Sequence, residues 1–430
     1  MPDIADRMSV IDTDSHVSEP ADLWQSRMPQ RWAELTPRIK ATDRPSGDIW
    51  VIDDRELGPA WGFAPAGWRE PFPSHPRVVE EVDPAAWEPR ARARKLDEFG
   101  IRAQVLYPNI LGVHIRTLME VGDRAFQAAC FSAYNDFLAE FAQAAPGRFI
   151  PIMAVPLFDL EASVREIERC IEMGHKGILF SNAPEKAGLP ALRDPHWDPI
   201  FRTAEDAGLS VNIHIGFGEA APAARSGESD RQGDQKLWDA FASGFGVTEL
   251  IPDVVKLTTM GFLSNAQAIA ELIVSGLCAR YPTLNFVSVE SGFGYIPYLI
   301  EALDWQWINY DATNLFPDRL LPSEYFRRQI YTTFWFETDS LTRIVDLYPD
   351  NVMFETDFPH PTCIAPGPAS RTGSARNVIQ ENLRYVPEDI LRKLLFENAA
   401  RVYGISAEWT IGSAIVAGDR RAARLSHELY

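Results

Sequence analysis

Short apolar segments alternate with longer amphipathic segments along most of the chain. The short segments are rich in β-branched and aromatic residues, and their apolar residues run continuously instead of alternating with polar ones. Continuous apolar runs of this length predict strands that are buried on both faces, as in a parallel sheet. Eight such strands are predicted, at residues 9–14, 103–108, 149–157, 176–182, 209–217, 284–292, 329–337 and 351–358.

Helical patterns lie between these strands, and several of them end on glycine or just before proline, as helices commonly do. Helices are predicted at residues 123–147, 160–174, 198–208, 265–282, 296–310, 339–349 and 389–404. Strands that alternate with helices favour an α/β fold of the (β/α)8 barrel type, the TIM barrel, formed by residues 1–430 as a single domain. An open doubly wound sheet is the alternative. The barrel is favoured because eight units fit it and no glycine-rich dinucleotide loop follows the first strand.

Two insertions interrupt the pattern. Residues 20–87 separate the first strand from its helix and are rich in proline, tryptophan and turn residues. Within them, "GDIWVIDDRELG" (residues 47–58) predicts a small hairpin, and we expect the whole insertion to form a lid over the top of the barrel. The second insertion, residues 218–235, is small and polar, which indicates a mobile loop after the fifth strand.

Composition narrows the class of protein. The 430 residues are 46% hydrophobic and 23% charged, which is enough apolar material for a sizeable core. The formal net charge of -19 argues against a nucleic acid or an anionic membrane surface as partner. No apolar run approaches the roughly 20 residues needed to span a bilayer, so no membrane segment is expected.

The cysteines and the N-terminal sequence favour a cytoplasmic protein. None of the four cysteines belongs to a CxxC pair, and four in a chain of this length do not form a disulfide framework. The sequence begins without a basic head followed by an apolar stretch, so no signal peptide is visible. We therefore expect a reduced, cytoplasmic setting.

Histidines and carboxylates follow four of the predicted strands at their carboxyl ends, where the chemistry of a (β/α)8 barrel is located. They are Asp14 and His16 after the first strand, His214 on the fifth, Glu290 on the sixth, and Asp357 with His360 after the eighth. Imidazole and carboxylate ligands suit Zn, Fe and Mn. A further carboxylate can accept or return a proton, so the sequence predicts a catalytic metal site.

Each of these residues also has a structural interpretation. Asp14 could shape a turn, His214 could be a core histidine, and Glu290 could cap the following helix. His360, between two prolines, could belong to a turn. The metal site is favoured because all of them reach the same rim of the barrel, and Glu19 is a further candidate ligand there.

At these residues the sequence resembles the amidohydrolase superfamily, in the amidohydrolase-related (amidohydrolase 2) branch that includes aminocarboxymuconate semialdehyde decarboxylase. The resemblance extends through nearly the whole chain. It is carried by "IDTDSHVSEP" (residues 11–20), "VNIHIG" (211–216), "VSVESGFGYIPYLIEALD" (287–304), "MFETDFPHP" (353–361) and "ENAARVYGI" (397–405).

The resemblance implies roles for individual residues. Asp14 and His16 stand where the family has its first-strand metal ligands, and His214 stands at the fifth-strand ligand. Asp357 matches the aspartate that contacts the metal and handles a proton. Glu290 stands where the decarboxylases usually carry a histidine as acid and base, so Asp357 and Glu290 are the candidate catalytic residues.

Three functions remain open at this point. The first is hydrolysis or non-oxidative decarboxylation of a small organic substrate, with one divalent metal, expected to be Zn, that activates water. The second is a dinuclear Fe or Fe/Mn oxygenase of the 2-aminoisobutyrate hydroxylase type, in which Glu290 and His360 bind the second ion. The third is a non-catalytic structural subunit of a complex.

The partners expected from the sequence are a small-molecule substrate and another protein subunit, either a second copy or a related barrel. "DWQWINY" (residues 304–310) is a candidate for the subunit contact. Tyr107, Asn109 and Trp335 could line the pocket, because each lies on or at the end of a predicted strand.

Overall fold

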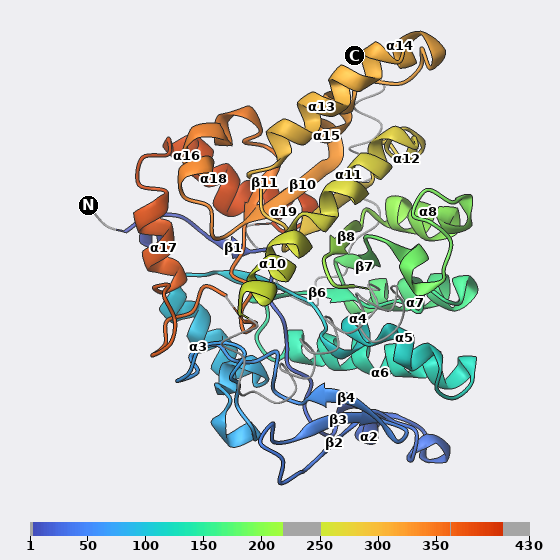
Figure 1. The fold of residues 1–430 in the computed structure, drawn as a ribbon, viewed down its shortest axis with the longest axis vertical. Coiled ribbons are helices and arrows are strands. Elements are labelled where there is room, and N and C mark those ends of the chain that lie inside the picture. The colour runs from blue at the N-terminus through green and yellow to red at the C-terminus, as the bar shows by residue number, and fades with distance from the viewer. Residues whose placement is uncertain (1–2, 218–250, 362, 407–430) are drawn as a thin grey trace.

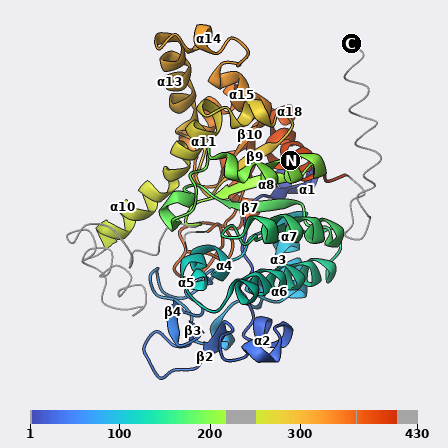
Figure 2. The same ribbon diagram turned by 90° about the vertical axis from the view of Figure 1, so that its right-hand side faces the viewer.

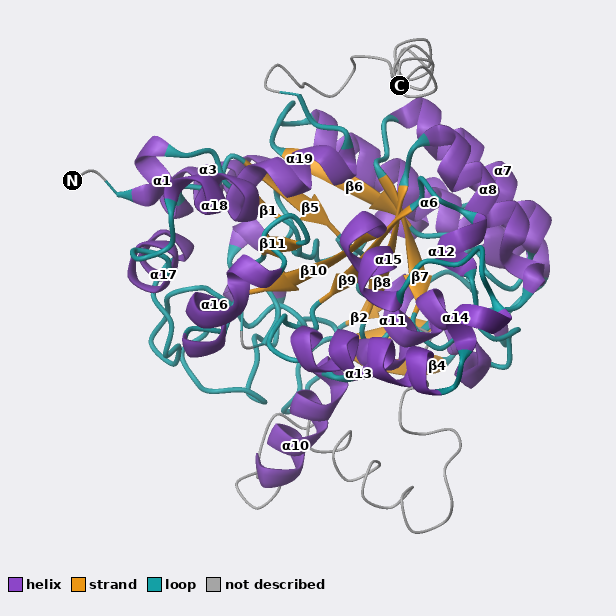
Figure 3. Ribbon diagram, turned by 90° about the horizontal axis from the view of Figure 1, so that it is seen from above, coloured by secondary structure: helices purple, strands orange, loops and turns teal. Residues whose placement is uncertain are grey.

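Eight parallel strands form a nearly closed barrel at the centre of the molecule, and helices surround it (Figure 1, Figure 3). The computed structural model describes residues 3–217, 251–361 and 363–406. The strands are β1 (Ile11–Asp12), β5 (Ala103–Leu106), β6 (Phe149–Met153), β7 (Gly177–Ser181), β8 (Ser210–His214), β9 (Asn285–Val289), β10 (Ile330–Phe334) and β11 (Val352–Phe354). Each lies within its predicted range, so the barrel prediction is confirmed.

The strands pair in chain order, β1-β5-β6-β7-β8-β9-β10-β11, and every pair is parallel. The first and last strands meet across the seam of the barrel. There the amide of Thr13 donates to the carbonyl oxygen of Phe354 over 2.9 Å, and Ser15 forms a parallel bridge with Phe358. All eight carboxyl ends therefore meet at one rim.

The helices between the strands begin and end on the expected signals. Asp123 accepts a hydrogen bond from the amide of Phe126 at the start of the helix at Arg124–Gln143, and Gly174 ends the helix at Leu160–Met173 in the left-handed conformation. The main surrounding helices are α3 (Pro89–Phe99), α6 (Arg124–Gln143), α7 (Leu160–Met173), α8 (Asp198–Ala207), α11 (Ser264–Val274), α13 (Ile296–Asn309), α15 (Pro322–Gln329), α16 (Asp339–Ile344), α17 (Ala375–Asn382), α18 (Glu388–Arg392) and α19 (Asn398–Tyr403). Shorter or peripheral helices are α1 (Ile4–Arg7), α2 (Leu23–Arg27), α4 (Ile110–Val113), α5 (Ile115–Met119), α10 (Ile251–Phe262), α12 (Leu277–Arg280) and α14 (Ala312–Leu315).

Side chains fill the inside of the barrel. Ile11, Val105, Ile152, Val287 and Met353 come from five strands and are all fully buried there. A second apolar layer lies between the strands and the helices. Because the interior is packed, the strand ends are where a ligand can bind. The four cysteines are buried and free, in agreement with the sequence prediction of no disulfide framework.

The insertion at residues 20–87 contains a three-stranded antiparallel sheet of β2 (Arg38–Lys40), β3 (Ile49–Ile52) and β4 (Arg55–Pro59). The predicted hairpin is β3 with β4, whereas the pattern of the sequence did not indicate β2. The insertion contacts the loop after β11, because the amide of Ala66 donates to the carbonyl oxygen of Pro359 over 3.1 Å. A function as a lid stays a prediction. The predicted mobile loop, residues 218–235, lies outside the described residues.

The sequence predicted that no apolar segment is long enough to span a bilayer, and this prediction was wrong. Ile251–Val274, which joins α10 and α11, is long and apolar enough to do so by length and composition. α10 was not predicted. α11 packs against the barrel, because the side-chain amide of Asn265 donates to the carbonyl oxygens of Ile213 and Val289. Ala268, Ile269, Leu272 and Ile273 of α11 therefore belong to the outer apolar layer, whereas no residue of α10 is buried.

Candidate metal centre

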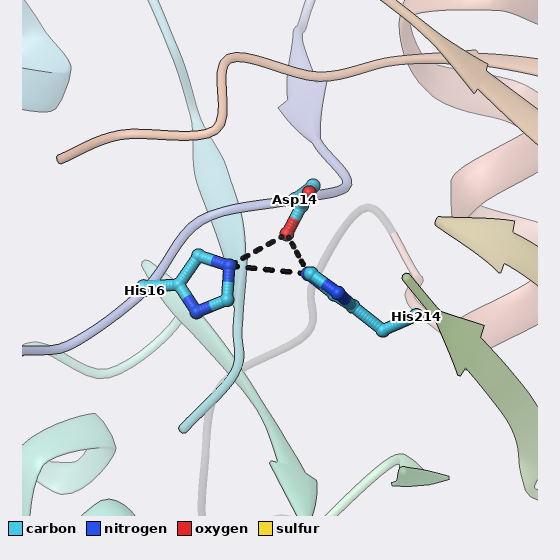
Figure 4. Close-up of side chains that lie close together, drawn as sticks. All are labelled: Asp14, His16 and His214. Atoms are coloured by element: carbon cyan, nitrogen blue, oxygen red, sulfur yellow. Dashed lines mark hydrogen bonds and ion pairs between the residues drawn. The ribbon is translucent and has the colours of Figure 1, made fainter. Parts of the chain in front are cut away.

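The structure brings all six predicted site residues together at the carboxyl ends of β1, β8, β9 and β11. Three groups share members: Asp14 with His16 and His214, His16 with Asp357 and His360, and Asp14 with Glu290 and Asp357. In each group the potential ligand atoms lie within 4.8 Å of one another. Figure 4 shows the first group, whose three side chains point toward one another. Their convergence was predicted from positions hundreds of residues apart, and their role as ligands stays a prediction.

The first group is formed by two imidazoles and one carboxylate. The Nε2 atoms of His16 and His214 are 3.1 Å apart. Oδ1 of Asp14 lies 3.6 Å from Nε2 of His16 and 3.5 Å from Nε2 of His214. Asp357 completes the arrangement, with its Oδ1 3.6 Å from Nε2 of His16.

Backbone contacts fix the tautomers of both histidines. Nδ1 of His16 lies 3.2 Å from the carbonyl oxygen of Pro108, and Nδ1 of His214 lies 2.7 Å from that of Ile215. A carbonyl oxygen can only accept a hydrogen bond, so each Nδ1 carries the proton. Each Nε2 is then unprotonated and carries a lone pair. The two lone pairs point toward each other and toward the carboxylate of Asp14. A cation between them would turn this repulsion into attraction.

The spacing of these atoms fits a metal ion. Two ligand atoms about 2.1 Å from one ion, at an angle of about 90° to 110°, are about 3.0 to 3.4 Å apart. The separations of 3.1, 3.5 and 3.6 Å among His16, His214 and Asp14 agree with this within a few tenths of an ångström. Both oxygens of Asp14 and of Asp357 are buried without a hydrogen-bond partner among the described residues. The donor set and its unsatisfied oxygens therefore fit a divalent cation.

A second set of ligand atoms adjoins the first. Nε2 of His360 donates to Oδ1 of Asn109 over 2.6 Å, so its Nδ1 is a lone pair, and that atom lies 3.1 Å from Oδ1 of Asp357. The amide of Asn109 is oriented by its Nδ2, which donates to the carbonyl oxygen of Val17. Glu290 belongs to the group with Asp14 and Asp357. A second cation at this position would remove the repulsion between the lone pair of His360 Nδ1 and those of the neighbouring carboxylate oxygens.

Burial sets the protonation of the cluster. It raises the pKa of Asp14 and of Asp357 well above the usual range for aspartate, and for Asp14 the neighbouring Asp357 adds to this. Burial lowers the pKa of His16 well below its usual value, and the nearby His360 and His214 lower it further. Neutral imidazoles cannot form ion pairs with Asp14. The negative charge of an ionised carboxylate in this cluster therefore has no positively charged partner in the protein. A bound cation lowers the carboxylate pKa values again.

Two of the acidic residues have strained backbones. Glu290 has a φ of 53° and Asp357 a φ of 59°, in the left-handed region that non-glycine residues seldom adopt. The loop after Glu290 is held by Glu337, whose Oε1 accepts hydrogen bonds from the amides of Phe293 and Gly294. Strain that the surrounding structure maintains is common where side chains must be aimed at a ligand.

Three buried residues outside the six predicted site residues support the cluster. Asp12 accepts hydrogen bonds from the amide and the hydroxyl of Thr356, at 2.8 and 2.5 Å. Arg92 donates to the carbonyl oxygen of His16 over 2.5 Å. Glu355 is fully buried beside the cluster, and burial and Asp14 raise its pKa well above the usual range. The charged residues inside otherwise apolar segments were the available signal for Asp12 and Glu355.

Other predicted residues differ in their placement. Glu19 is outside the three ligand groups, and its Oε1 instead accepts hydrogen bonds from the amides of Asn109 and Ile110. It was wrong to count it as a further ligand, since its carboxylate is used to hold the loop after β5. Asn109 does contact the cluster through His360. Trp335 packs edge to face on Phe262 of α10, with ring centroids 5.1 Å apart.

Comparisons with known proteins agree with this architecture. A family model described as Amidohydrolase matches residues 11–405. The gamma-resorcylate decarboxylase of Polaromonas sp. (strain JS666 / ATCC BAA-500) is 27% identical over 279 residues, which cover 62% of this chain and 76% of that protein.

Solved structures show the same fold. The structure of an amidohydrolase from Mycobacterium avium subsp. paratuberculosis K-10 has a TM-score of 0.68 and 22% identity, over 92% of this chain and 99% of that one. A dihydroxybenzoic acid decarboxylase from Polaromonas sp. JS666, with bound manganese and the inhibitor 2-nitroresorcinol, has a TM-score of 0.56 and 21% identity, over 93% and 97%.

Proposed function

The chain belongs to the amidohydrolase family, and on that basis we propose that it catalyses a metal-dependent, non-oxidative decarboxylation of a small organic acid. It is a metal-dependent enzyme of this family, whose relatives include decarboxylases. The observation that carries the proposal is the pair of imidazole lone pairs that face the carboxylate of Asp14 at the barrel rim. Hydrolysis of a small substrate is the other reaction that the same ligands support.

Asp14, His16, His214 and Asp357 would hold the cation. When bound, it would supply the positive charge that orients the substrate carboxylate and lowers the pKa of bound water. The mixture of imidazole and carboxylate suits Mn, Fe and Zn alike. The Zn expected from the sequence has no particular support, whereas the decarboxylase structure from Polaromonas sp. contains manganese. We therefore propose a divalent cation, with manganese as the first to be tested.

Glu290 is suited to move the proton. Its side chain is 16% exposed, so it lies closer to the solvent than Asp14 and Asp357, which are both nearly fully buried. Burial raises its pKa well above the usual range, and the charge of Asp357 raises it further. When the bond between the substrate carbon and CO2 breaks, its electron pair stays on that carbon. A protonated Glu290 can supply the proton for the new C–H bond and recover one from water.

A dinuclear oxygenase is the second candidate, and His360 favours it. Nδ1 of His360 carries a lone pair and lies 3.1 Å from Oδ1 of Asp357. A single ion held by Asp14, His16, His214 and Asp357 would not need this nitrogen as a ligand. Asp14, His16, His214, Glu290, Asp357 and His360 would together hold two cations. This set of three carboxylates and three imidazoles suits iron and manganese, the metals of oxygen-dependent chemistry, as well as zinc.

Metal analysis separates the two candidates. The protein would be expressed with manganese, iron and zinc present, and the metal content per chain measured by mass spectrometry. About one equivalent, together with CO2 release from hydroxybenzoates without oxygen consumption, supports the decarboxylase. About two equivalents that include iron, together with oxygen uptake, support the oxygenase. No bound metal after supplementation would contradict both and favour a structural subunit.

A substitution at Glu290 sharpens the comparison. Glu290→Gln keeps about one equivalent of metal in the decarboxylase but loses the proton donor, so turnover falls by about a hundredfold or more. In the dinuclear enzyme the same change lowers the metal content from about two equivalents toward one. Glu301→Gln, at an exposed position on α13, is the matched control and should change neither metal content nor turnover.

A further inference from the structure

A cavity of about 300 Å³ adjoins the metal cluster, between the insertion and the loop that follows β11. Trp68 and Phe72 line it from the insertion, and His360, Cys363 and Arg371 line it from the loop. Its volume is within the range of small-molecule sites, at the low end. The cavity thus has a largely apolar and aromatic lining, with the hydroxyl groups of Ser370 and Thr372 and the charged side chains of Glu70 and Arg371.

His360 belongs both to this cavity and to the metal cluster. Its ring stacks on that of His16, with centroids 3.6 Å apart and an angle of 15° between the planes. Its Nδ1 lies 3.1 Å from Oδ1 of Asp357. A molecule in the cavity therefore lies against a side chain that is itself part of the predicted reaction centre.

Close packing fixes the walls of the cavity. A Cβ atom added to Gly367 would lie 2.7 Å from Cα of Gly67, so the loop after β11 and the insertion touch through their backbones. The hydrogen bond from the amide of Ala66 to the carbonyl oxygen of Pro359 holds the same two segments together. The space between them is a consequence of this packing.

Arg371 and Glu70 are the charged side chains that line the cavity. Glu70 is already engaged, because its Oε2 accepts a hydrogen bond of 2.5 Å from the hydroxyl of Ser74 and its Oε1 lies 3.8 Å from Nε of Arg69. The side chain of Arg371 makes no ion pair or hydrogen bond with any residue of the described ranges. A guanidinium group matches the geometry of a carboxylate with two parallel hydrogen bonds, and this one is available for a ligand.

We propose that this cavity is the substrate pocket and that Arg371 binds an anionic group of the substrate remote from the reacting end. The substrate is then a small organic acid with a flat or apolar body that carries a second anionic group. The body lies against Trp68 and Phe72, and the reacting end lies at His360. This inference rests on the proposed function for the reacting end, whereas the role of Arg371 in binding does not depend on turnover.

Calorimetric titration with benzene dicarboxylates tests the proposal. Isophthalate and terephthalate are the probes, each compared with its monomethyl ester, which lacks the second charge. For the manganese-loaded protein we expect at least one dicarboxylate to bind about 10- to 100-fold more tightly than its ester, the range of a charge-assisted hydrogen-bonded pair. Arg371→Met should remove that difference and leave the affinity of the ester unchanged, and Arg371→Lys should restore part of it.

The controls keep the two proposals distinguishable. Arg165→Met, at an exposed position on α7, should bind the probes like the unmodified protein. Metal content is measured for every variant, and Arg371→Met should keep it, since Arg371 is outside the ligand groups. A preference that depends on Arg371 in a protein without bound metal would support the pocket and contradict the proposed function. Equal affinities of acid and ester, no binding of either dicarboxylate, or a preference that persists in Arg371→Met would overturn the role of Arg371.

Discussion

The Nε2 atoms of His16 and His214 face each other at 3.1 Å, although each ring already donates its Nδ1 proton to a backbone carbonyl oxygen. Two lone pairs at this separation repel unless one ring is protonated or a cation lies between them. Burial lowers the pKa of both histidines, which disfavours the protonated form. A cation bound between the two Nε2 atoms is the remaining way to offset their repulsion, and the nearby Asp14 carboxylate is suited to bind it.

Replacement of Asp14 tests whether a cation binds at this position. Asp14→Asn keeps the size of the side chain but removes its charge, so we expect metal content to fall at least tenfold while the protein remains folded. The metal-free variant should be as stable as the metal-free parent or more stable, because an uncompensated buried carboxylate has been removed. Metal analysis and thermal unfolding measure the two effects. Asp318→Asn, at an exposed position, is the control, and full metal content in Asp14→Asn would remove Asp14 from the ligands.

Residues that hold the ligand-bearing segments in place should affect metal affinity nearly as much as the ligands themselves. Thr356 donates its amide and hydroxyl protons to Asp12 and accepts a hydrogen bond from the amide of Phe358, and it thereby joins β1 to the segment that carries Asp357. Thr356→Val removes the hydroxyl contacts without changing the shape of the side chain. We expect the metal affinity to fall about 10- to 100-fold and the free energy of unfolding by about 1 to 3 kcal/mol.

Thr332 provides a matched control on the neighbouring strand. Its hydroxyl is buried in β10 and has no hydrogen-bond partner among the described residues. Thr332→Val should therefore leave metal affinity unchanged and should not destabilise the protein. If Thr332→Val and Thr356→Val lose the same metal affinity, loss of the Asp12 contact is not the cause, and Asp12 has no special role in holding the ligands.

The strands and the ligand cluster were predictable from the sequence because they depend on local patterns. A strand buried on both faces has a continuous apolar run, and a polar residue at its carboxyl end stands out, as His214 and Glu290 do. The closed barrel then places these ends at one rim. Glu290 and Asp357 could not be assigned their strained backbones from sequence, because the left-handed conformation is imposed by tertiary contacts.

Residues whose partners are distant in sequence were not predictable. Arg92 lies on α3, and its guanidinium group donates to the carbonyl oxygen of His16, 76 positions away. Glu19 appeared to be a ligand because it is close to His16 in sequence, yet it holds the amides of Asn109 and Ile110. α10 was missed because none of its residues is buried, so its apolar side chains form no core-facing stripe.

A histidine far from the metal cluster should control stability at acid pH. His175 is fully buried, and its Nε2 donates to the carbonyl oxygen of Asn135 over 3.1 Å. Burial lowers its pKa to about 4, from a usual value of 6.5. The contribution of the neutral form to stability is thus complete above pH 6.5 and is lost as the pH falls toward 4. Between pH 7.5 and pH 5 this amounts to about 2 kcal/mol.

His175→Gln should flatten that dependence. Glutamine can donate to Asn135 and does not titrate, so the free energy of unfolding of the variant should fall less than that of the parent between pH 7.5 and pH 5. Urea unfolding at several pH values measures the difference. His196→Gln, at an exposed position, should keep the slope of the parent. A slope that is the same in all three proteins would show that His175 is not the group responsible.

Residues 304–310, the candidate subunit contact, lie in the segment formed by α13 and α14, which extends from the barrel in Figures 1 and 2, and we expect this segment to contact a second copy of the chain. Trp305, Ile308, Tyr310 and Leu315 are each at least 59% exposed there. An aromatic side chain can bury roughly 150 to 250 Å². With Tyr298 on the same helix, these side chains together approach the roughly 800 Å² that each partner contributes to a stable interface.

Charged substitutions on this segment should therefore separate the subunits. We expect the protein to sediment as a dimer or larger oligomer, and the double variant Trp305→Glu with Ile308→Glu to sediment as a monomer, because the new charges would have to be buried against the partner. Tyr385→Glu is the matched control, since Tyr385 is 79% exposed but lies between α17 and α18, away from this segment. A parent protein that is monomeric at micromolar concentration, or a double variant that remains oligomeric, would contradict the assignment of α13 and α14 as the interface.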